Sequence, residues 1–197
     1  MKYDRNTVKA WAGNSQWRAI LADMARFRSN GYSGWGSEGF WALAIYRLQK
    51  VIRGYQPRWF WTPLLLGLSV VRKLFTMITH IDIDPGAEIG PGLLIPHVGT
   101  IRVHGDTRMG ADCSLYHGCT IGAGPRPGGA TIGDHVYIAC NSSIIGAVKV
   151  GDGAFIAANT LVIEDVPRGT TAIGVPARIL PATDGMTRKF RRQPIAG

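Results

Sequence analysis

The stretch TIGDHVYIACNSSIIGAVKVGDGAFIAANTLVI, residues 131–163, decides the fold. An aliphatic residue stands at every sixth position in it, namely Ile132, Ile138, Ile144, Val150, Ile156 and Val162. Neither the 3.6-residue period of a helix nor the two-residue period of a strand explains this spacing. It is typical of a solenoid in which six residues form a short strand and a turn, with the aliphatic side chain pointing inward. Three such sides make a coil of about 18 residues, and successive coils stack at the strand spacing of about 4.8 Å.

The same spacing continues on both sides of this stretch. Upstream it includes Ile83, Ile89, Ile95 and Ile101, then slips by two residues to Val103, Met109, Leu115 and Ile121; downstream it includes Ile173 and Ile179. The position four residues after each aliphatic is usually small or β-branched, and this places Cys113 and Cys119 inside the coil as small apolar residues. We therefore predict a mainly β protein, a parallel β-helix over residues 81–180.

The residues before position 81 follow a helical period instead. Apolar residues at helical spacing predict one helix around residues 17–27 and a second over residues 40–52. Thr62 and Pro63 have the pattern of an N-cap and first-turn pair that opens a third helix. We predict an N-terminal helical region, residues 1–80, that covers one open end of the solenoid, and a basic tail, residues 181–197, at the other.

Charge and apolar segments limit the possible partners. The chain of 197 residues carries 22 Lys and Arg against 13 Asp and Glu, a net charge of +9, which favours anionic partners. Nucleic acid is not expected, because no stacking or groove-reading motif accompanies the charge. The apolar stretch that starts at Trp59 is too short to span a bilayer and contains Pro63. We expect a cytoplasmic protein, because the cysteines form no disulfide framework and the start has no signal-peptide core.

Two basic segments raise the possibility of a membrane contact. The aromatic and basic stretch RGYQPRWFW, residues 53–61, and the tail segment RKFRRQ, residues 188–193, could hold the protein at the inner face of an anionic membrane. The alternative, which we favour from the sequence, is that Trp59, Phe60 and Trp61 pack the helices onto the β-helix.

Several motifs together resemble the serine O-acetyltransferase-like branch of the hexapeptide acyltransferases. They are GFWALAIYRL (residues 39–48), IDIDPGAEIGPG (81–92), IPHVGTIRVHG (95–105), CTIGAG (119–124) and AIGVPARIL (172–180). The resemblance is closest to the shorter members that act in surface-polysaccharide biosynthesis. It implies a left-handed parallel β-helix and a homotrimer that binds acetyl-CoA in clefts between subunits.

The resemblance also assigns the chemistry to particular residues. Transfer of an acetyl group to a hydroxyl requires a base near neutrality, which suits a histidine, and a carboxylate that orients its ring. The matching positions are His97, in PHVGT, and Asp82, in IDIDP, and their separation of fifteen residues is that of the family. Counting hexads places His117 on the next coil directly beside His97, as a further catalytic candidate, and Cys140 one coil beyond.

Two departures from the family pattern concern the acceptor. The Asp that precedes the family's catalytic His and helps to hold serine is Pro96 here, and PGGATI, residues 127–132, has glycine where the family has a second active-site His. We therefore expect a less charged acceptor, such as a hydroxyl of a sugar or of a lipid-linked glycan. Serine O-acetylation and a non-catalytic scaffold or binding role remain the alternatives.

The remaining site predictions concern acetyl-CoA and the acceptor. The family's cofactor contacts correspond to Thr120, Gly122, Ala123, Ala139, Ala157, Ala177 and Arg178, the last as a phosphate partner. His104 and Arg126 are candidate acceptor contacts. No metal is expected, because a three-histidine zinc site of the β-helix type needs an HxxxxH pair and the sequence has none.

Overall fold

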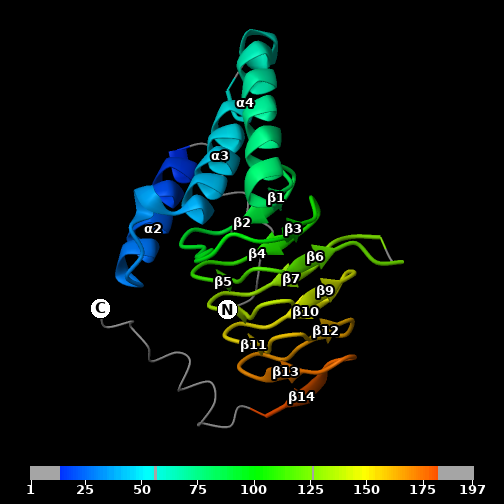
Figure 1. Cartoon of the computed structure of the whole chain (residues 1–197). Helices are drawn as coiled ribbons and strands as arrows, with labels where there is room; N and C mark the ends of the chain where they lie inside the picture. Colours follow the sequence, from blue (N-terminus) through cyan, green and yellow to red (C-terminus); the bar gives the residue numbers. More distant parts are fainter. Residues whose placement is uncertain (1–13, 56, 126, 182–197) are drawn as a thin grey trace.

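Helices precede strands in the computed structural model, which describes residues 14–55, 57–125 and 127–181. The helices α2 (Asn14–Ser29), α3 (Glu38–Arg53) and α4 (Arg58–Thr79), with the 3-10 turn η1 (Gly34–Gly36), stand at one end of a stack of short strands (Figure 1). The strands are β1 (Ile81–Ile83), β2 (Glu88–Ile89), β3 (Ile101–Val103), β4 (Arg108–Met109), β5 (Ser114–Leu115), β6 (Thr120–Gly122), β7 (Thr131–Ile132), β8 (Tyr137–Ile138), β9 (Ser143–Ile145), β10 (Lys149–Val150), β11 (Phe155–Ile156), β12 (Leu161–Val162), β13 (Thr171–Ile173) and β14 (Arg178–Leu180).

The strands form a three-sided parallel β-helix, and the prediction of the fold is confirmed. Sheet A has the order β1-β3-β6-β9-β12, sheet B the order β10-β7-β4-β2, and sheet C the order β14-β13-β11-β8-β5. Thr131 pairs with Lys149, so 149 − 131 = 18 residues separate equivalent positions on successive coils. The solenoid has about five turns and matches the left-handed form.

The inward residues of the coils are the aliphatic residues of the hexads, with two exceptions. From Ile83 to Val162 every predicted inward position is buried. Ile173 and Ile179, however, are 41% and 40% exposed, so their prediction as inward residues is wrong. The last coil moves from sheet A to sheet B in four residues, from Val162 to Val166, and this shift in phase makes Ala172 the inward residue of β13. Ile179 lies on β14, which pairs antiparallel at the edge of sheet C and closes the stack.

The two-residue slip in the sequence is a longer turn at one corner of the prism. Ile95 ends the sheet C side of the first coil, and Val103 pairs with Ile83 on sheet A. The equivalent step on the next coil runs from Leu115 to Ile121 and takes six residues, whereas the step from Ile95 to Val103 takes eight. The longer turn contains His97.

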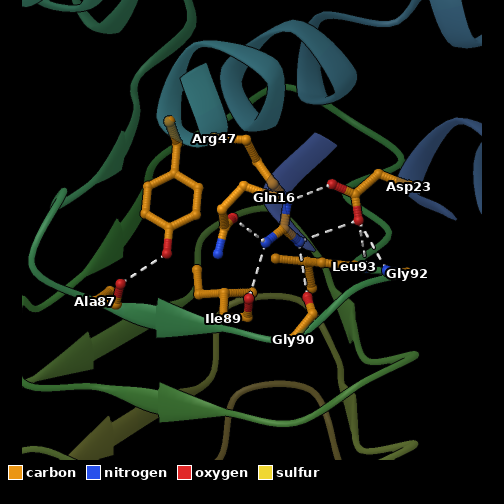
Figure 2. A network of polar contacts seen from close by, with 9 residues as sticks. Gln16, Asp23, Arg47, Ala87, Ile89, Gly90, Gly92 and Leu93 are labelled. Atoms are coloured by element: carbon orange, nitrogen blue, oxygen red, sulfur yellow. Dashed lines mark hydrogen bonds and ion pairs between the residues drawn. The ribbon is translucent and has the colours of Figure 1, made fainter. Parts of the chain in front are cut away.

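Side chains of α2 and α3 satisfy the backbone groups at the open end of the first coil (Figure 2). Arg47 donates to the carbonyl oxygens of Ile89 and Gly90 at 2.8 and 2.7 Å, and Tyr46 donates to the carbonyl of Ala87 at 2.6 Å. A sheet edge would otherwise leave these carbonyls without strand partners. The helices therefore cap the solenoid through hydrogen bonds as well as through apolar contact.

A carboxylate completes this cap. Asp23 accepts from the backbone N–H groups of Gly92 and Leu93 at 2.8 and 3.1 Å and from Arg47 at 2.8 Å. Both side chains of the ion pair are buried, and Gln16 accepts a further bond from Arg47 at 3.3 Å. Because each charged group has several partners, the network lies in the interior without unsatisfied charge.

Helix α4 differs from the prediction at its start and in its surroundings. It begins at Arg58 rather than at Thr62, and Pro63 lies inside it. The expectation that the aromatic residues pack onto the β-helix is wrong for Trp59 and Phe60, which are exposed. The expectation that the apolar stretch from Trp59 is too short to span a bilayer is also wrong, because by length and composition residues 59–79 of the described chain could cross a membrane. Almost none of this segment is buried.

Candidate active site

The two candidate catalytic histidines lie on successive turns of one corner of the prism, between sheets C and A. The rings of His97 and His117 are 6.2 Å apart, and His97 is exposed. The backbone N–H of Asn141 donates to the carbonyl of His117 at 2.9 Å, which places Cys140 one coil further along. The predicted column of His97, His117 and Cys140 is therefore confirmed in its geometry. We call these turns the histidine corner.

Gly99 allows the turn of His97 to lie close to the next one. It has a φ of 140°, which favours glycine, and a Cβ at this position would lie 2.9 Å from the Cβ of His117. The turn backbone can therefore approach the next coil only because this residue has no side chain.

Two tyrosine rings also lie near His97. Tyr32, from the loop after α2, lies 5.9 Å from the His97 ring in an edge-on arrangement, and Tyr116 lies 6.3 Å from it. Tyr116 continues into a ladder on sheet C, with Tyr137 at 5.0 Å and Phe155 a further 4.9 Å along. The ladder follows the rungs of β8 and β11.

Two phenols of this cluster, those of Tyr32 and Tyr137, have a raised pKa. Burial, followed by the neighbouring Tyr116, raises the pKa of Tyr32. Burial, followed by a hydrogen bond with Tyr116, raises the pKa of Tyr137. Near neutral pH Tyr32 therefore presents a hydroxyl group, not a charge, beside His97, and Tyr137 does the same beside Tyr116.

Asp82 has a different partner from the one predicted. Its Oδ1 accepts from Nη1 of Arg72 on α4 at 2.7 Å, in a half-exposed ion pair. Within the described part of one protomer, no hydrogen bond or ion pair joins Asp82 to His97. The expected carboxylate–imidazole pair is thus not formed inside a single chain, where the carboxylate pairs with a basic side chain of α4.

The predicted cofactor residues run along the histidine corner and the adjoining sheet A. Ala139 and Ala157 follow the paired strands β8 and β11, so they lie at the same corner on successive coils. Thr120 is on a rung of sheet A, and Gly122 ends the same strand, with Ala123 next to it. These small, half-buried or exposed positions fit a slender chain that lies along the corner.

The other predicted contacts are more scattered. Ala177 donates its backbone N–H to the carbonyl of Leu161 at 2.8 Å, which places it beside sheet A, and Arg178 is exposed on β14. His104 lies at the next corner, between sheets A and B, where its Nδ1 accepts from the N–H of Asp106 at 3.2 Å. Within one protomer His104 is therefore separated from His97 by the length of β3. Arg126 lies outside the described residues.

Comparison with known proteins identifies the family. Residues 129–164 match the model of the bacterial transferase hexapeptide, six repeats. The chain is 34% identical over 145 residues to a serine acetyltransferase of Helicobacter pylori, covering 72% of this chain and 81% of that protein. The chain belongs to the serine acetyltransferase family.

Solved structures of this family share the fold. The soybean serine acetyltransferase apoenzyme superposes with a TM-score of 0.73 at 31% identity, covering 89% of this chain and 72% of that one. A serine acetyltransferase in complex with CoA gives a TM-score of 0.70 at 27% identity, with coverages of 84% and 70%. This member of the serine acetyltransferase family is accordingly an O-acetyltransferase with acetyl-CoA as its donor.

Three residues around the site and the cap, Tyr32, Tyr116 and Arg47, were not predicted from the sequence, although two of them had a signal there. Tyr32 lies in a Gly- and Ser-rich loop that showed only a break between helices, and it reaches His97 because α2 and α3 are fixed on the first coil. Tyr116 directly precedes His117, so its place on the rung could have been read from the hexad count. The buried Arg47 had a signal too, since it stands four residues from the buried Leu43 and Val51 on the same helix face.

Proposed function

We propose that this protein transfers the acetyl group of acetyl-CoA to the hydroxyl group of L-serine, with His97 as the general base. The observation that carries the proposal is the exposed imidazole of His97 on the histidine corner, at the position that matches the family's catalytic motif. The relatives and solved structures of similar sequence are serine acetyltransferases, and this supports serine over the glycan acceptor that the sequence motifs alone favoured.

The chemistry at His97 follows from the reaction. A ring nitrogen takes the proton of the acceptor hydroxyl as its oxygen attacks the thioester carbonyl. The C–S bond then breaks, the acetyl group stays on the acceptor oxygen, and the proton returns from the imidazolium to the thiolate of CoA. A base of this kind contributes about 10² to 10⁴ in rate. His117, the neighbouring ring, assists by holding the orientation of His97 or of the acceptor.

Asp82 is proposed as a positioning residue for His97, in line with the family motif. Arg72 occupies Oδ1 of Asp82, and no partner is seen for the other oxygen among the described residues. The ion pair with Arg72 would fix the orientation of this carboxylate on β1.

We further propose a cytoplasmic homotrimer whose active sites lie between subunits. His97 is exposed in the single protomer, and the acceptor and the thioester need a cleft that excludes water. A neighbouring subunit would provide the second wall and bring its corner between sheets A and B, which carries His104, toward His97. The small residues Ala139 and Ala157 would line the path of the pantetheine arm, and Arg178 would meet a phosphate of CoA.

A glycan hydroxyl is the second candidate acceptor, and one observation favours it. The rings around His97 belong to Tyr32, Tyr116 and His117, and Pro96 stands where the family has an Asp. The ammonium and carboxylate of serine need charged partners, whereas the ring contacts of His97 within one protomer are with two phenols and an imidazole. Phenol hydroxyls suit a neutral sugar, which donates and accepts hydrogen bonds without charge.

A panel of acceptors decides between these functions. Purified protein is incubated with acetyl-CoA and L-serine, nucleotide sugars or isolated glycan precursors, thiol release is followed, and products are identified by mass spectrometry. The proposal predicts O-acetylserine as the main product. Turnover with sugars alone would establish the second candidate, and neither turnover nor acetyl-CoA binding would indicate a scaffold.

A further inference from the structure

We propose that the outward face of α4 is a lipid-binding surface that holds the protein on an anionic membrane. This goes beyond the acetyl transfer and concerns a different part of the molecule. The outward face comprises exposed residues from one side of the helix: Trp59, Phe60, Pro63, Leu64, Leu66, Gly67, Val70, Val71, Leu74, Met77 and Ile78.

These residues form one continuous apolar strip. At about 100° per residue they span roughly 160° of the helix circumference, and the helix of 22 residues is about 33 Å long. The indole N–H of Trp59 is the one hydrogen-bonding side-chain group within this strip. A surface helix of a water-soluble protein shows the opposite arrangement, with its polar side outward. The strip is therefore more stable in contact with an apolar environment than in water.

Three polar side chains of α4, those of Ser69, Arg72 and Thr76, turn toward the protein instead, whereas Thr62 and Lys73 are exposed beside the strip. Ser69 accepts from Gln49 of α3 at 3.3 Å, Thr76 donates to the carbonyl of Ile81 at 3.1 Å, and Arg72 pairs with Asp82. These contacts fix the rotation of the helix, so the apolar strip cannot turn inward without breaking them. In Figure 1, α4 stands beyond the first coil with α3 along one side.

The charge of the helical hairpin matches an anionic surface. Residues 38–79 contain six basic residues against one acidic residue, Glu38. Arg47 and Arg72 are paired with Asp23 and Asp82, which leaves Lys50, Arg53, Arg58 and Lys73 as the excess positive charge. Lys73 flanks the apolar strip and Arg53 lies at the hairpin turn, both exposed. Each basic residue near a membrane surface adds attraction to anionic lipid headgroups.

Aromatic residues lie at the end of this strip that is next to the turn between α3 and α4. Tyr55, Trp59 and Phe60 are exposed there, and the ring of Trp61 lies 5.3 Å from that of Tyr55. Aromatic rings beside basic residues are enriched at the boundary between headgroups and acyl chains, because one end of such a ring is apolar and the other is wet.

Lipid fits this face better than a second copy of the chain. Interfaces between proteins carry about one hydrogen bond per 100–200 Å², whereas acyl chains require none, and the strip offers a single indole donor. A second copy would also bring a hairpin with the same excess of positive charge. The helix lies in the membrane surface rather than crossing it, because its other side is packed on α3, where Gln49 and Lys50 would enter the hydrocarbon.

Flotation of the full-length protein with vesicles tests the proposal. Vesicles of phosphatidylcholine and phosphatidylglycerol (70:30) are compared with pure phosphatidylcholine, at 0.1 and 0.5 M NaCl. We expect wild-type protein to float with the anionic vesicles and to remain largely bound at high salt. Leu66→Asp combined with Val70→Asp should lower the partition coefficient at least tenfold.

The matched control carries the same change on another exposed helix face. Trp17→Asp combined with Leu21→Asp places two acids four residues apart on α2, and flotation should stay within about twofold of wild type. Absence of wild-type flotation, its loss at 0.5 M NaCl, or unchanged flotation of the α4 variant would overturn the proposal.

A smaller oligomer mass of the α4 variant by light scattering, without wild-type flotation, would instead assign the face to a second copy. Acetyl transfer without vesicles should be equal in both variants, so failure here is separable from failure of the proposed activity.

Discussion

Arg47 and Asp23 form a buried ion pair that joins both capping helices to the first coil of the β-helix. The two side chains are 0% and 1% exposed, and the pair is closed by hydrogen bonds of 2.8 and 3.2 Å (Figure 2). The same groups satisfy backbone carbonyls and N–H groups from Ile89 to Leu93. The pair therefore fixes the helical cap, and with it Tyr32, relative to the histidine corner.

Removal of one partner from this pair should destabilise the protein strongly. Arg47→Met leaves the carboxylate of Asp23 buried without its cation, and we expect a loss of about 3 to 5 kcal/mol in the free energy of unfolding. Chemical denaturation measures it. Arg108→Met is the control, because Arg108 and Glu88 form an exposed pair at 3.3 Å, and the expected loss is below about 1 kcal/mol. Equal losses in the two variants would contradict the role of the buried pair.

Gly39 controls how closely α3 approaches the turn that precedes His97. A Cβ at Gly39 would overlap the carbonyl oxygen of Ile95, which is backbone and cannot move aside. We expect Gly39→Ala to cost about 1 to 3 kcal/mol of stability and to lower activity by displacing the turn. Gly67→Ala, in α4, meets nothing within 4 Å and should stabilise the helix by about 0.5 to 1 kcal/mol. Thermal unfolding measures the stability of both glycine variants, and thiol release measures their activity.

The three cysteines should differ in reactivity. Burial raises the pKa of the Cys113 thiol to about 12 and also raises the pKa of Cys119. At pH 8 both are therefore almost entirely protonated, whereas Cys140 is half-exposed on the histidine corner. Mass spectrometry after iodoacetamide treatment should find Cys140 modified first, and acetyl-CoA should slow that reaction several-fold. Modification of Cys113 at a similar rate in folded protein, or no protection by acetyl-CoA, would contradict this assignment.

The Asp82–Arg72 pair allows the proposed positioning role to be separated from a structural one. Asp82→Asn should lower kcat about tenfold or more with little change in the KM for acetyl-CoA, if the carboxylate orients His97. Arg72→Met should change kcat less, because it leaves the carboxylate in place. Both should cost under about 1 kcal/mol in stability, since the pair is half-exposed. If Asp82→Asn and Arg72→Met lose the same activity and also the same stability, Asp82 has a structural role alone.

The hexads made the β-helix predictable because each inward side chain must meet the same position of the next coil. This constraint also placed His97 beside His117, since a stacked corner repeats residue by residue. It failed at Ile173 and Ile179, where the last coil shortens one side and β14 closes the edge in the opposite direction. The partner of Asp82 could not be read from spacing, because Arg72 reaches it from a helix outside the repeat. The apolar composition of the segment around Trp59 can be read from the sequence. Its exposure cannot, because it depends on which side of α4 contacts α3.

The most direct test of the central claim is the turnover number of His97→Asn with acetyl-CoA and L-serine. The matched control is His135→Asn, which changes an exposed histidine at a turn with positive φ that asparagine accepts. The account predicts a fall in kcat of about 10² to 10⁴ for His97→Asn, with the KM for acetyl-CoA nearly unchanged, and wild-type values for His135→Asn. Turnover of His97→Asn within a few-fold of wild type would contradict the assignment of His97 as the base.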